Sequence, residues 1–184
     1  TKSELINLGR KMNPDIKDED SALKTGIENF VIELSCLQNV FSDKELRDNT
    51  ILVVANSEND GASGLKSDQY RATRNALYCL VDGIFSSKPS DVKYFLGKGV
   101  DTVQRISDLY GNIMPCYHGS DAHINSKIFE PDLNRYCYLK AETTFEGLKQ
   151  TLTDPEDRVF IGKRPPVLDR IIQNPEKIIK SVYI

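Results

Sequence analysis

The stretch Ile51-Leu52-Val53-Val54-Ala55-Asn56 decides the fold class. Its first five residues form the longest clean apolar run of the chain, and that run has the length of a strand. A parallel strand covered by helices on both faces shows such a continuous apolar run, because neither set of alternating side chains meets water. The sequence therefore predicts a parallel strand near the centre of a sheet, with Asn56 at its carboxyl end.

Other short apolar runs alternate with amphipathic helical stretches. Helices are predicted over 67–81 and 101–110, the second with Asp101 as its cap and Gly111 as its left-handed stop. Thr143-Thr144-Phe145-Glu146 has the pattern of a capping box that opens another helix. Further strands are predicted at 30–34, 83–85, 113–117, 136–139 and 159–161. This alternation predicts an α/β fold in which parallel strands with flanking helices form a sheet or a barrel.

The end of the chain follows a different pattern. Pro165-Pro166 marks a joint, because proline is excluded from the interior of helices and sheets. Beyond it we expect a short helix and then a second one, with Asn174 as cap and Pro175 at the first helical position. The expected organisation is an α/β domain over 1–164 and a C-terminal helical appendage or linker over 165–184.

Composition narrows the functional classes. The 184 residues suit one domain, and a net charge of −3 excludes a nucleic-acid-binding module held by bulk positive charge. No run approaches the roughly 18 apolar residues of a membrane helix, so no membrane partner is expected. The cysteines form no CxxC pair and lie in or beside apolar stretches, which predicts buried free thiols in a reducing cytoplasm. They are Cys36, Cys79, Cys116 and Cys137.

Both histidines of the chain fall in His118-Gly119-Ser120-Asp121-Ala122-His123, which follows a predicted strand. Asp121 and His123 are two residues apart, so in an extended segment they point to the same side and could hold one divalent metal. The alternative is that Asp121 caps the next helix and both histidines are loop residues at the surface. A nucleophilic Ser120 or Cys116 is less favoured, because there is no GxSxG elbow and Cys116 lies in an apolar strand.

The loop 56–67 also follows a strand and leads into a helix. Lys66-Ser67 matches the end of a phosphate-cradling GxxxxGK[ST] loop, but Asp60 and Leu65 occupy the glycine positions. A polar loop with Asp-Gly turns is the alternative to phosphate or nucleotide binding by Lys66 and Ser67. Asn56 at the start of this loop could also reach a metal at the carboxyl edge of the sheet.

The run 118–123 resembles the last metal motif of the polymerase-and-histidinol-phosphatase (PHP) superfamily, and the strands at 51–56 and 81–84 have the order and spacing of its middle strands. The blocks at 144–150 and 158–162 are similar to the PHP version that is fused to an AAA-like ATPase, the TrlF-like group. The second resemblance also includes Asn56-Ser57, Asp60-Gly61, Ser63-Gly64 and Ala72-Thr73-Arg74.

The resemblance implies part of a distorted seven-stranded α/β barrel with divalent metals (zinc, manganese or magnesium) at its carboxyl-end rim. Asp121 and His123 match its last pair of ligands, and His118 is the predicted catalytic residue, which would contact phosphate or donate a hydrogen bond to a metal ligand. Two departures stand out: no His-x-His pair opens the chain, and Asn56 stands where the family has a metal-binding histidine. We therefore expect the N-terminal barrel strands and a downstream ATPase to belong to the rest of the polypeptide, with weak or no metal binding by this portion alone.

Three functions follow from these observations. The first is a portion of a metal-dependent phosphoesterase with a nucleic-acid or nucleotide phosphoester substrate, in which this portion alone is inactive. The second is a degenerate, metal-free PHP-like module that binds or regulates an ATPase. The third is ATP or phosphate binding by the loop 56–67.

Overall fold

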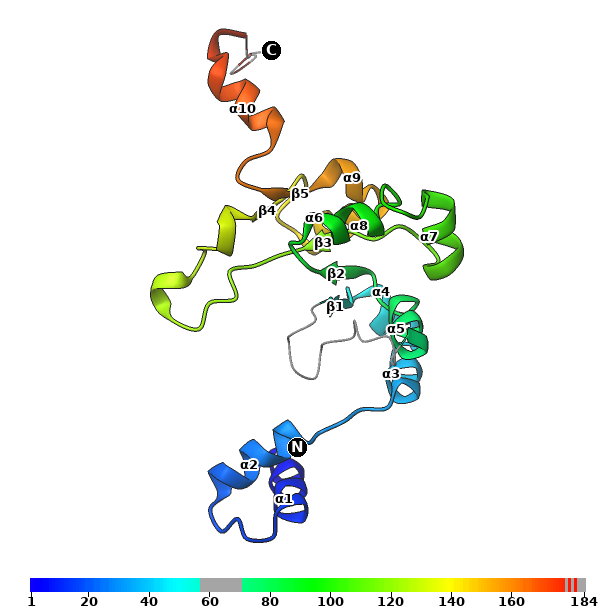
Figure 1. The fold of residues 1–184 in the computed structure, drawn as a ribbon, viewed down its shortest axis with the longest axis vertical. Helices are drawn as coiled ribbons and strands as arrows, with labels where there is room; N and C mark the ends of the chain where they lie inside the picture. The colour runs from blue at the N-terminus through cyan, green and yellow to red at the C-terminus, as the bar shows by residue number, and fades with distance from the viewer. Residues whose placement is uncertain (57–70, 178, 180, 182–184) are drawn as a thin grey trace. The chain divides into compact units, whose positions relative to one another are not determined.

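The computed structural model describes residues 1–56, 71–177, 179 and 181, and the chain divides into two compact units, Thr1–Asn49 and Thr50–Ile184. The first unit contains α1 (Lys2–Met12), α2 (Glu19–Glu28), α3 (Leu34–Val40) and α4 (Lys44–Asp48) (Figure 1). The sequence analysis places no boundary at Asn49.

Helices α1 and α2 pack against each other through two glycines. A Cβ atom added at Gly9 would overlap the carbonyl oxygen of Ala22, and one added at Gly26 would overlap that of Leu5. The start of α1 is fixed by a capping box between Thr1 and Glu4. The backbones of the two helices therefore lie so close together at these positions that only glycine fits there.

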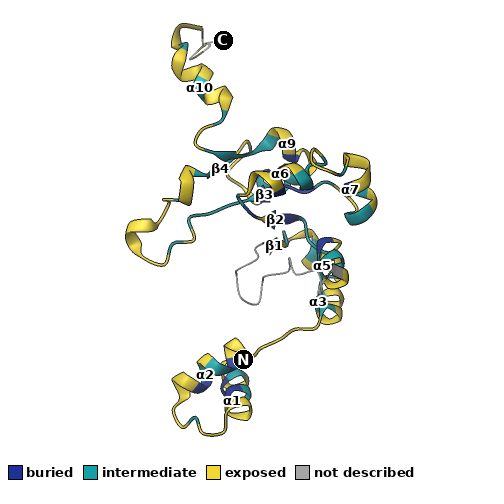
Figure 2. Cartoon of the chain, in the orientation of Figure 1, coloured by how far each residue is buried: buried dark blue, intermediate teal, exposed yellow. Residues whose placement is uncertain are grey.

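The second unit is built on a three-stranded parallel sheet in the order β1-β2-β3 (Figure 1). Its strands are β1 (Val53–Ala55), β2 (Gly83–Phe85) and β3 (Cys116–Tyr117). The flanking helices are α5 (Arg71–Tyr78), α6 (Pro89–Phe95) and α7 (Val103–Tyr110). The core joins residues from α5, α6, β2 and β3 and from the segment that leads into β3: Tyr78, Phe95, Ile84, Cys116 and Met114. Figure 2 shows the burial of β2 at the centre of the sheet.

The rest of the second unit contains a second, smaller sheet. Strands β4 (Tyr136–Leu139) and β5 (Val159–Gly162) pair antiparallel, and β5 contacts β3. The remaining elements are η3 (Asn125–Lys127), η4 (Asp132–Asn134), α8 (Phe145–Thr153), α9 (Pro155–Arg158), α10 (Pro166–Gln173) and η5 (Pro175–Lys177). Helix α10 is largely exposed (Figure 2).

The mixed α/β class with parallel strands and flanking helices is confirmed, and the described residues form no closed barrel. The central position predicted for the strand at 51–56 is wrong, because β1 is an edge strand within the described sheet and Val53 is 41% exposed. An apolar run indicates that both faces of a strand are covered. It does not indicate whether one or two neighbouring strands pair with its backbone, and that pairing decides whether the strand lies at the edge of the sheet. The expected parallel pairing also fails for β4 and β5.

The predicted strand at 30–34 is wrong. Residues 30–33 are not in a strand, and Leu34 begins α3. Phe30, Val31 and Ile32 are exposed, Val31 by 84%, so this β-branched segment has neither a ladder partner nor a covered face among the described residues. High strand propensity does not form a strand without such pairing.

Two helix starts differ from the expectation by one residue, and the helix predicted over 67–81 ends at Tyr78 rather than at residue 81. Helix α7 is capped by Thr102, whose Oγ1 accepts a hydrogen bond from the Arg105 amide, rather than by Asp101. Its stop at Gly111 is confirmed, with φ at +92°. Helix α8 is capped by Thr144 alone, because Gly147 occupies the third position and offers no side chain for a reciprocal bond.

Candidate functional site at the carboxyl edge of the sheet

The residues that follow β1, β2 and β3 are all polar and lie in adjacent positions. The Asn56 amide donates to the carbonyl oxygen of Phe85 at 3.1 Å, and the Ser86 amide donates to that of Tyr117 at 3.0 Å. These bonds extend the parallel ladder by one residue beyond the strands. Asn56, Ser86 and His118 therefore form a row across the carboxyl edge of the sheet.

A cavity of about 300 Å³ opens at this row. It brings together Asn56, His118 and Asp121, which the sequence analysis selected as site residues. It also contains a cation, Lys88, and the hydroxyls of two serines that directly follow β2. The complete lining is Asn56, Phe85, Ser86, Ser87, Lys88, His118 and Asp121.

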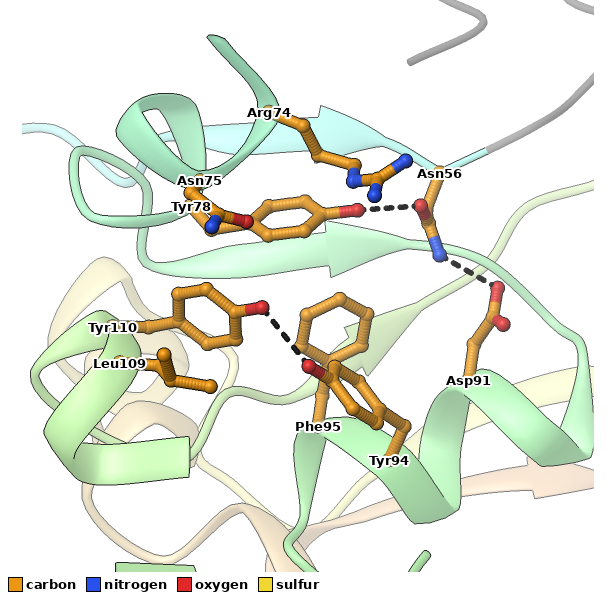
Figure 3. Close-up of a pocket in the computed structure, with 9 residues that line it drawn as sticks. All are labelled: Asn56, Arg74, Asn75, Tyr78, Asp91, Tyr94, Phe95, Leu109 and Tyr110. Carbon is orange, nitrogen blue, oxygen red and sulfur yellow. Dashed lines mark hydrogen bonds between the residues drawn. The ribbon is translucent and has the colours of Figure 1, made fainter. Parts of the chain in front are cut away.

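Behind the row lies a buried hydrogen-bond network centred on Asp91 of α6 (Figure 3). The Asn56 side-chain amide donates to Asp91 Oδ2 at 2.9 Å, and Ser86 Oγ donates to the same oxygen at 2.7 Å. The Tyr78 hydroxyl donates to Asn56 Oδ1 at 2.7 Å. Asn56 is 5% exposed and Asp91 is 8% exposed, so these bonds are largely shielded from water. The network fixes the Asn56 side chain from both ends.

Tyr78 remains a hydrogen-bond donor over a wide pH range. Burial of the ring is the main cause that raises the pKa of Tyr78 to about 12, and the nearby Asp91 adds to the rise while Arg74 opposes it. The hydroxyl is therefore protonated at neutral pH and keeps the Asn56 carbonyl oxygen satisfied.

The surroundings of His118 favour its neutral imidazole form. Burial lowers the pKa of His118 below its ordinary value of 6.5, and the Arg135 guanidinium lowers it further, against smaller opposing effects of Asp132 and Asp121. The ring lies 6.2 Å from that of Phe85 between centroids. A neutral imidazole can accept a proton or a hydrogen bond, so His118 has the form required of a general base.

Asp121 and His123 are close to each other but exposed. Asp121 Oδ1 and His123 Nε2 are 3.8 Å apart. Asp121 has φ of +50°, a left-handed conformation that aspartate tolerates better than most residues. It does not cap a helix, because the next helical turn, η3, is preceded by Ile124. The two side chains are therefore near neighbours on the exposed surface of this loop.

The third proposed metal ligand, Asn56, already forms hydrogen bonds within the protein. Both polar atoms of the Asn56 side chain are engaged by Asp91 and Tyr78. In the described part of the chain, His, Cys, Asp and Glu side chains form no group of three or more with a geometry that could hold a metal ion. Lys66 and Ser67, proposed for phosphate or nucleotide binding, lie outside the described residues.

The thiols differ in burial. Burial raises the pKa of Cys116 to about 12, which makes this thiol a poor nucleophile. All four cysteines are free, but the expectation that all are buried is wrong for Cys36 and Cys79, which are exposed, and Cys137 is only partly buried. Cys36 and Cys79 lie on or beside helices rather than in the sheet, where an apolar neighbour in sequence need not share the buried face.

Sequence reasoning missed Ser86, Lys88 and Asp91. Ser86 and Lys88 follow β2, so the rule that selects Asn56 after β1 and His118 after β3 also applies to them. Asp91 has no such signal, because it lies within a short helix and its role depends on packing.

Comparisons of the chain with models of protein families, with curated proteins and with solved structures found no match. None of the helices in the described ranges has both the length and the apolar character needed to cross a bilayer.

Proposed function

We propose that this chain is part of a metal-dependent phosphoesterase domain of the PHP type, within an ATPase-associated protein, and that a phosphoester group binds in the cavity at the carboxyl edge of the sheet. The observation that carries the proposal is the meeting of Asn56, Ser86, His118 and Asp121 around one cavity. Active sites of parallel α/β folds lie at this edge, where loops from several strands converge.

The cavity offers suitable groups for a phosphoester. Lys88 supplies a positive charge, and Ser86 and Ser87 supply hydroxyls beside it. The Lys88 backbone amide donates to Ser86 Oγ at 3.2 Å, and the Ser86 hydroxyl donates to Asp91, so Ser86 is held in one orientation. In the proposed site Lys88 binds a phosphate oxygen, and His118 takes a proton from the attacking water.

The metal part of the proposal uses Asp121 and His123. A carboxylate and an imidazole fit zinc or manganese, and these two side chains are near neighbours, but catalytic sites take three or more protein ligands. The described residues therefore fit as two ligands of such an ion. When bound, a divalent ion would supply an activated water and neutralise charge on the phosphoryl oxygens.

Hydrolysis of bis-p-nitrophenyl phosphate by the intact protein with manganese tests the proposal. The double variant Asp121→Ala/His123→Ala removes both proposed ligands, and we expect its rate to fall by a factor on the order of 100 or more. The matched control Glu130→Ala removes an exposed acidic side chain from the same loop region and should retain the activity. Equal rates in the double variant and the control would refute the proposal.

The second candidate is the metal-free module that regulates an ATPase. It is favoured by one observation, that Asn56 stands where the PHP pattern has a histidine and has both polar atoms engaged within the protein. It predicts no phosphoesterase activity in the intact protein and an ATPase cycle unaffected by Asp121→Ala/His123→Ala. Phosphate binding by Lys66 and Ser67 predicts instead that Lys66→Ala weakens ATP binding.

A further inference from the structure

Helix α10 (Pro166–Gln173) separates its apolar and polar side chains onto two faces. The apolar residues recur at spacings of three and four positions and therefore share one face: Val167, Leu168, Ile171 and Ile172. The positions between them are polar: Asp169, Arg170 and Gln173. All four apolar side chains are exposed, Ile172 by 59%, so this face meets solvent rather than a core (Figure 2). A contiguous exposed apolar face of this kind marks an interaction surface.

A groove along α10 places cations beside this apolar face. It has a volume of about 370 Å³ and extends from α10 to η5. Its lining combines the aliphatic side chains of Val167 and Ile171 with the positive charges of Arg170 and Lys177. The long stems of arginine and lysine can lie along an apolar surface while their charged ends stay in a polar layer. This combination fits a partner that presents hydrocarbon and negative charge side by side.

The segment that includes α10 differs in charge from the rest of the chain. Residues 163–184 contain five basic and two acidic side chains, whereas the whole chain contains 24 basic and 27 acidic ones. Arg164 pairs with Asp169 at 3.3 Å, and the sum over the segment stays positive. An anionic surface would therefore attract this segment and repel the remainder of the chain.

We propose that α10 lies on the surface of anionic lipid bilayers, with its apolar face in the headgroup region and its cations at the lipid phosphates. Interfacial helices have an exposed apolar face and basic side chains beside it. A bilayer matches both the apolar face and the charge, whereas an acidic polypeptide matches only the charge. The expectation of no membrane partner concerned spanning segments, and a helix in the plane of the interface needs no spanning length.

Sedimentation of the whole protein with lipid vesicles tests this inference. We expect vesicles of phosphatidylcholine with about 30% phosphatidylglycerol to bind the protein about tenfold or more tightly than phosphatidylcholine alone, because each basic side chain near an anionic surface strengthens binding. Sodium chloride at about 0.5 M should remove most of this preference, because it screens the attraction.

The double variant Ile171→Ser/Ile172→Ser removes two exposed apolar side chains without a change in charge. We expect it to weaken binding to the anionic vesicles by about tenfold or more. The matched control Val100→Ser/Val103→Ser removes two exposed valines at and before the start of α7 and should leave vesicle binding unchanged.

A second pair of variants separates the two proposed anion sites. Arg170→Gln/Lys177→Gln removes the cations of the groove and should reduce the preference for phosphatidylglycerol. Lys88→Ala removes the cation of the proposed phosphoester site and should leave vesicle binding unchanged. Loss of vesicle binding in Lys88→Ala would overturn the inference, because the lipid phosphates would then be held at the carboxyl edge of the sheet.

Three other results would also overturn the inference. They are absence of binding to the anionic vesicles, unchanged binding in Ile171→Ser/Ile172→Ser, and binding to poly-glutamate that exceeds binding to vesicles. The last result would assign α10 to an acidic protein partner. The inference does not rest on phosphoester hydrolysis, so loss of phosphoesterase activity with vesicle binding retained would contradict only the proposed function.

Discussion

The side-chain amide of Asn56 donates a hydrogen bond of 2.9 Å to the carboxylate of Asp91 and so ties the end of β1 to α6. The two residues are 35 positions apart in sequence, and both are buried. Asp91 also accepts from Ser86, which follows β2. One carboxylate thus orients two of the residues at the carboxyl edge of the sheet.

Asp91→Ala is expected to destabilise the second unit by about 2–4 kcal/mol. The substitution leaves the Asn56 amide and the Ser86 hydroxyl without their common acceptor, and each unsatisfied buried donor costs about 1–3 kcal/mol. Urea unfolding measures the effect. Asp157→Ala, which removes an exposed carboxylate, is the control and should change the free energy of unfolding by less than about 0.5 kcal/mol.

The stability of the second unit should fall as the pH rises from 10 toward 12. The pKa of Tyr78 is about 12 in the folded protein against 10 for the ordinary group, so the unfolded chain ionises first and is favoured at high pH. Urea midpoints measured at pH 9, 10 and 11 (about one pH unit apart) check this prediction. In Tyr78→Phe the decline should be smaller, and an equal decline would contradict the assignment to Tyr78.

Arg135→Gln is expected to raise the pKa of His118. Burial, the main cause of the lowered pKa of His118, remains in this variant, but the repulsion from the Arg135 cation is removed. NMR titration of the imidazole signals measures the shift. Lys127→Gln removes another cation from the segment between β3 and β4 and should leave the pKa of His118 unchanged. A lower pKa in Arg135→Gln would show that Arg135 does not act through its charge.

Gly9→Ala is expected to separate α1 from α2, because the added Cβ atom would overlap the backbone of Ala22. Overpacking of this kind costs about 1–3 kcal/mol, a large fraction of the stability of a helix pair. Amide hydrogen exchange should show lost protection in α1 and α2. Lys11→Ala, at an exposed position of α1, should keep that protection, and equal protection in both variants would contradict the close packing.

Local patterns in the sequence predicted the elements better than their pairing. The bounds predicted for the strands at 83–85 and 136–139 are confirmed, and Gly111 ends its helix as expected. The edge position of β1 and the antiparallel pairing of β4 with β5 were not predicted, because they depend on contacts between distant segments.

The same division applies to the candidate site. Asn56, His118 and Asp121 were selected because polar residues after parallel strands meet at one edge, and the structure places them around one cavity. The exposed position of His123 agrees with the alternative prediction that the histidines are loop residues at the surface. Asp91 was missed because its contacts with Asn56 and Ser86 arise only when α6 packs beside the sheet.

The central claim is that the cavity at the carboxyl edge binds a phosphoester, and NMR mapping of inorganic phosphate with magnesium tests it most directly. We predict amide shifts concentrated at Asn56, Ser86–Lys88 and His118 at about 10 mM phosphate, a concentration that detects millimolar binding. The shifts should disappear in Lys88→Ala and persist in Lys93→Ala, which removes an exposed lysine from α6. Shifts that are absent, lie elsewhere or survive in Lys88→Ala would contradict the account.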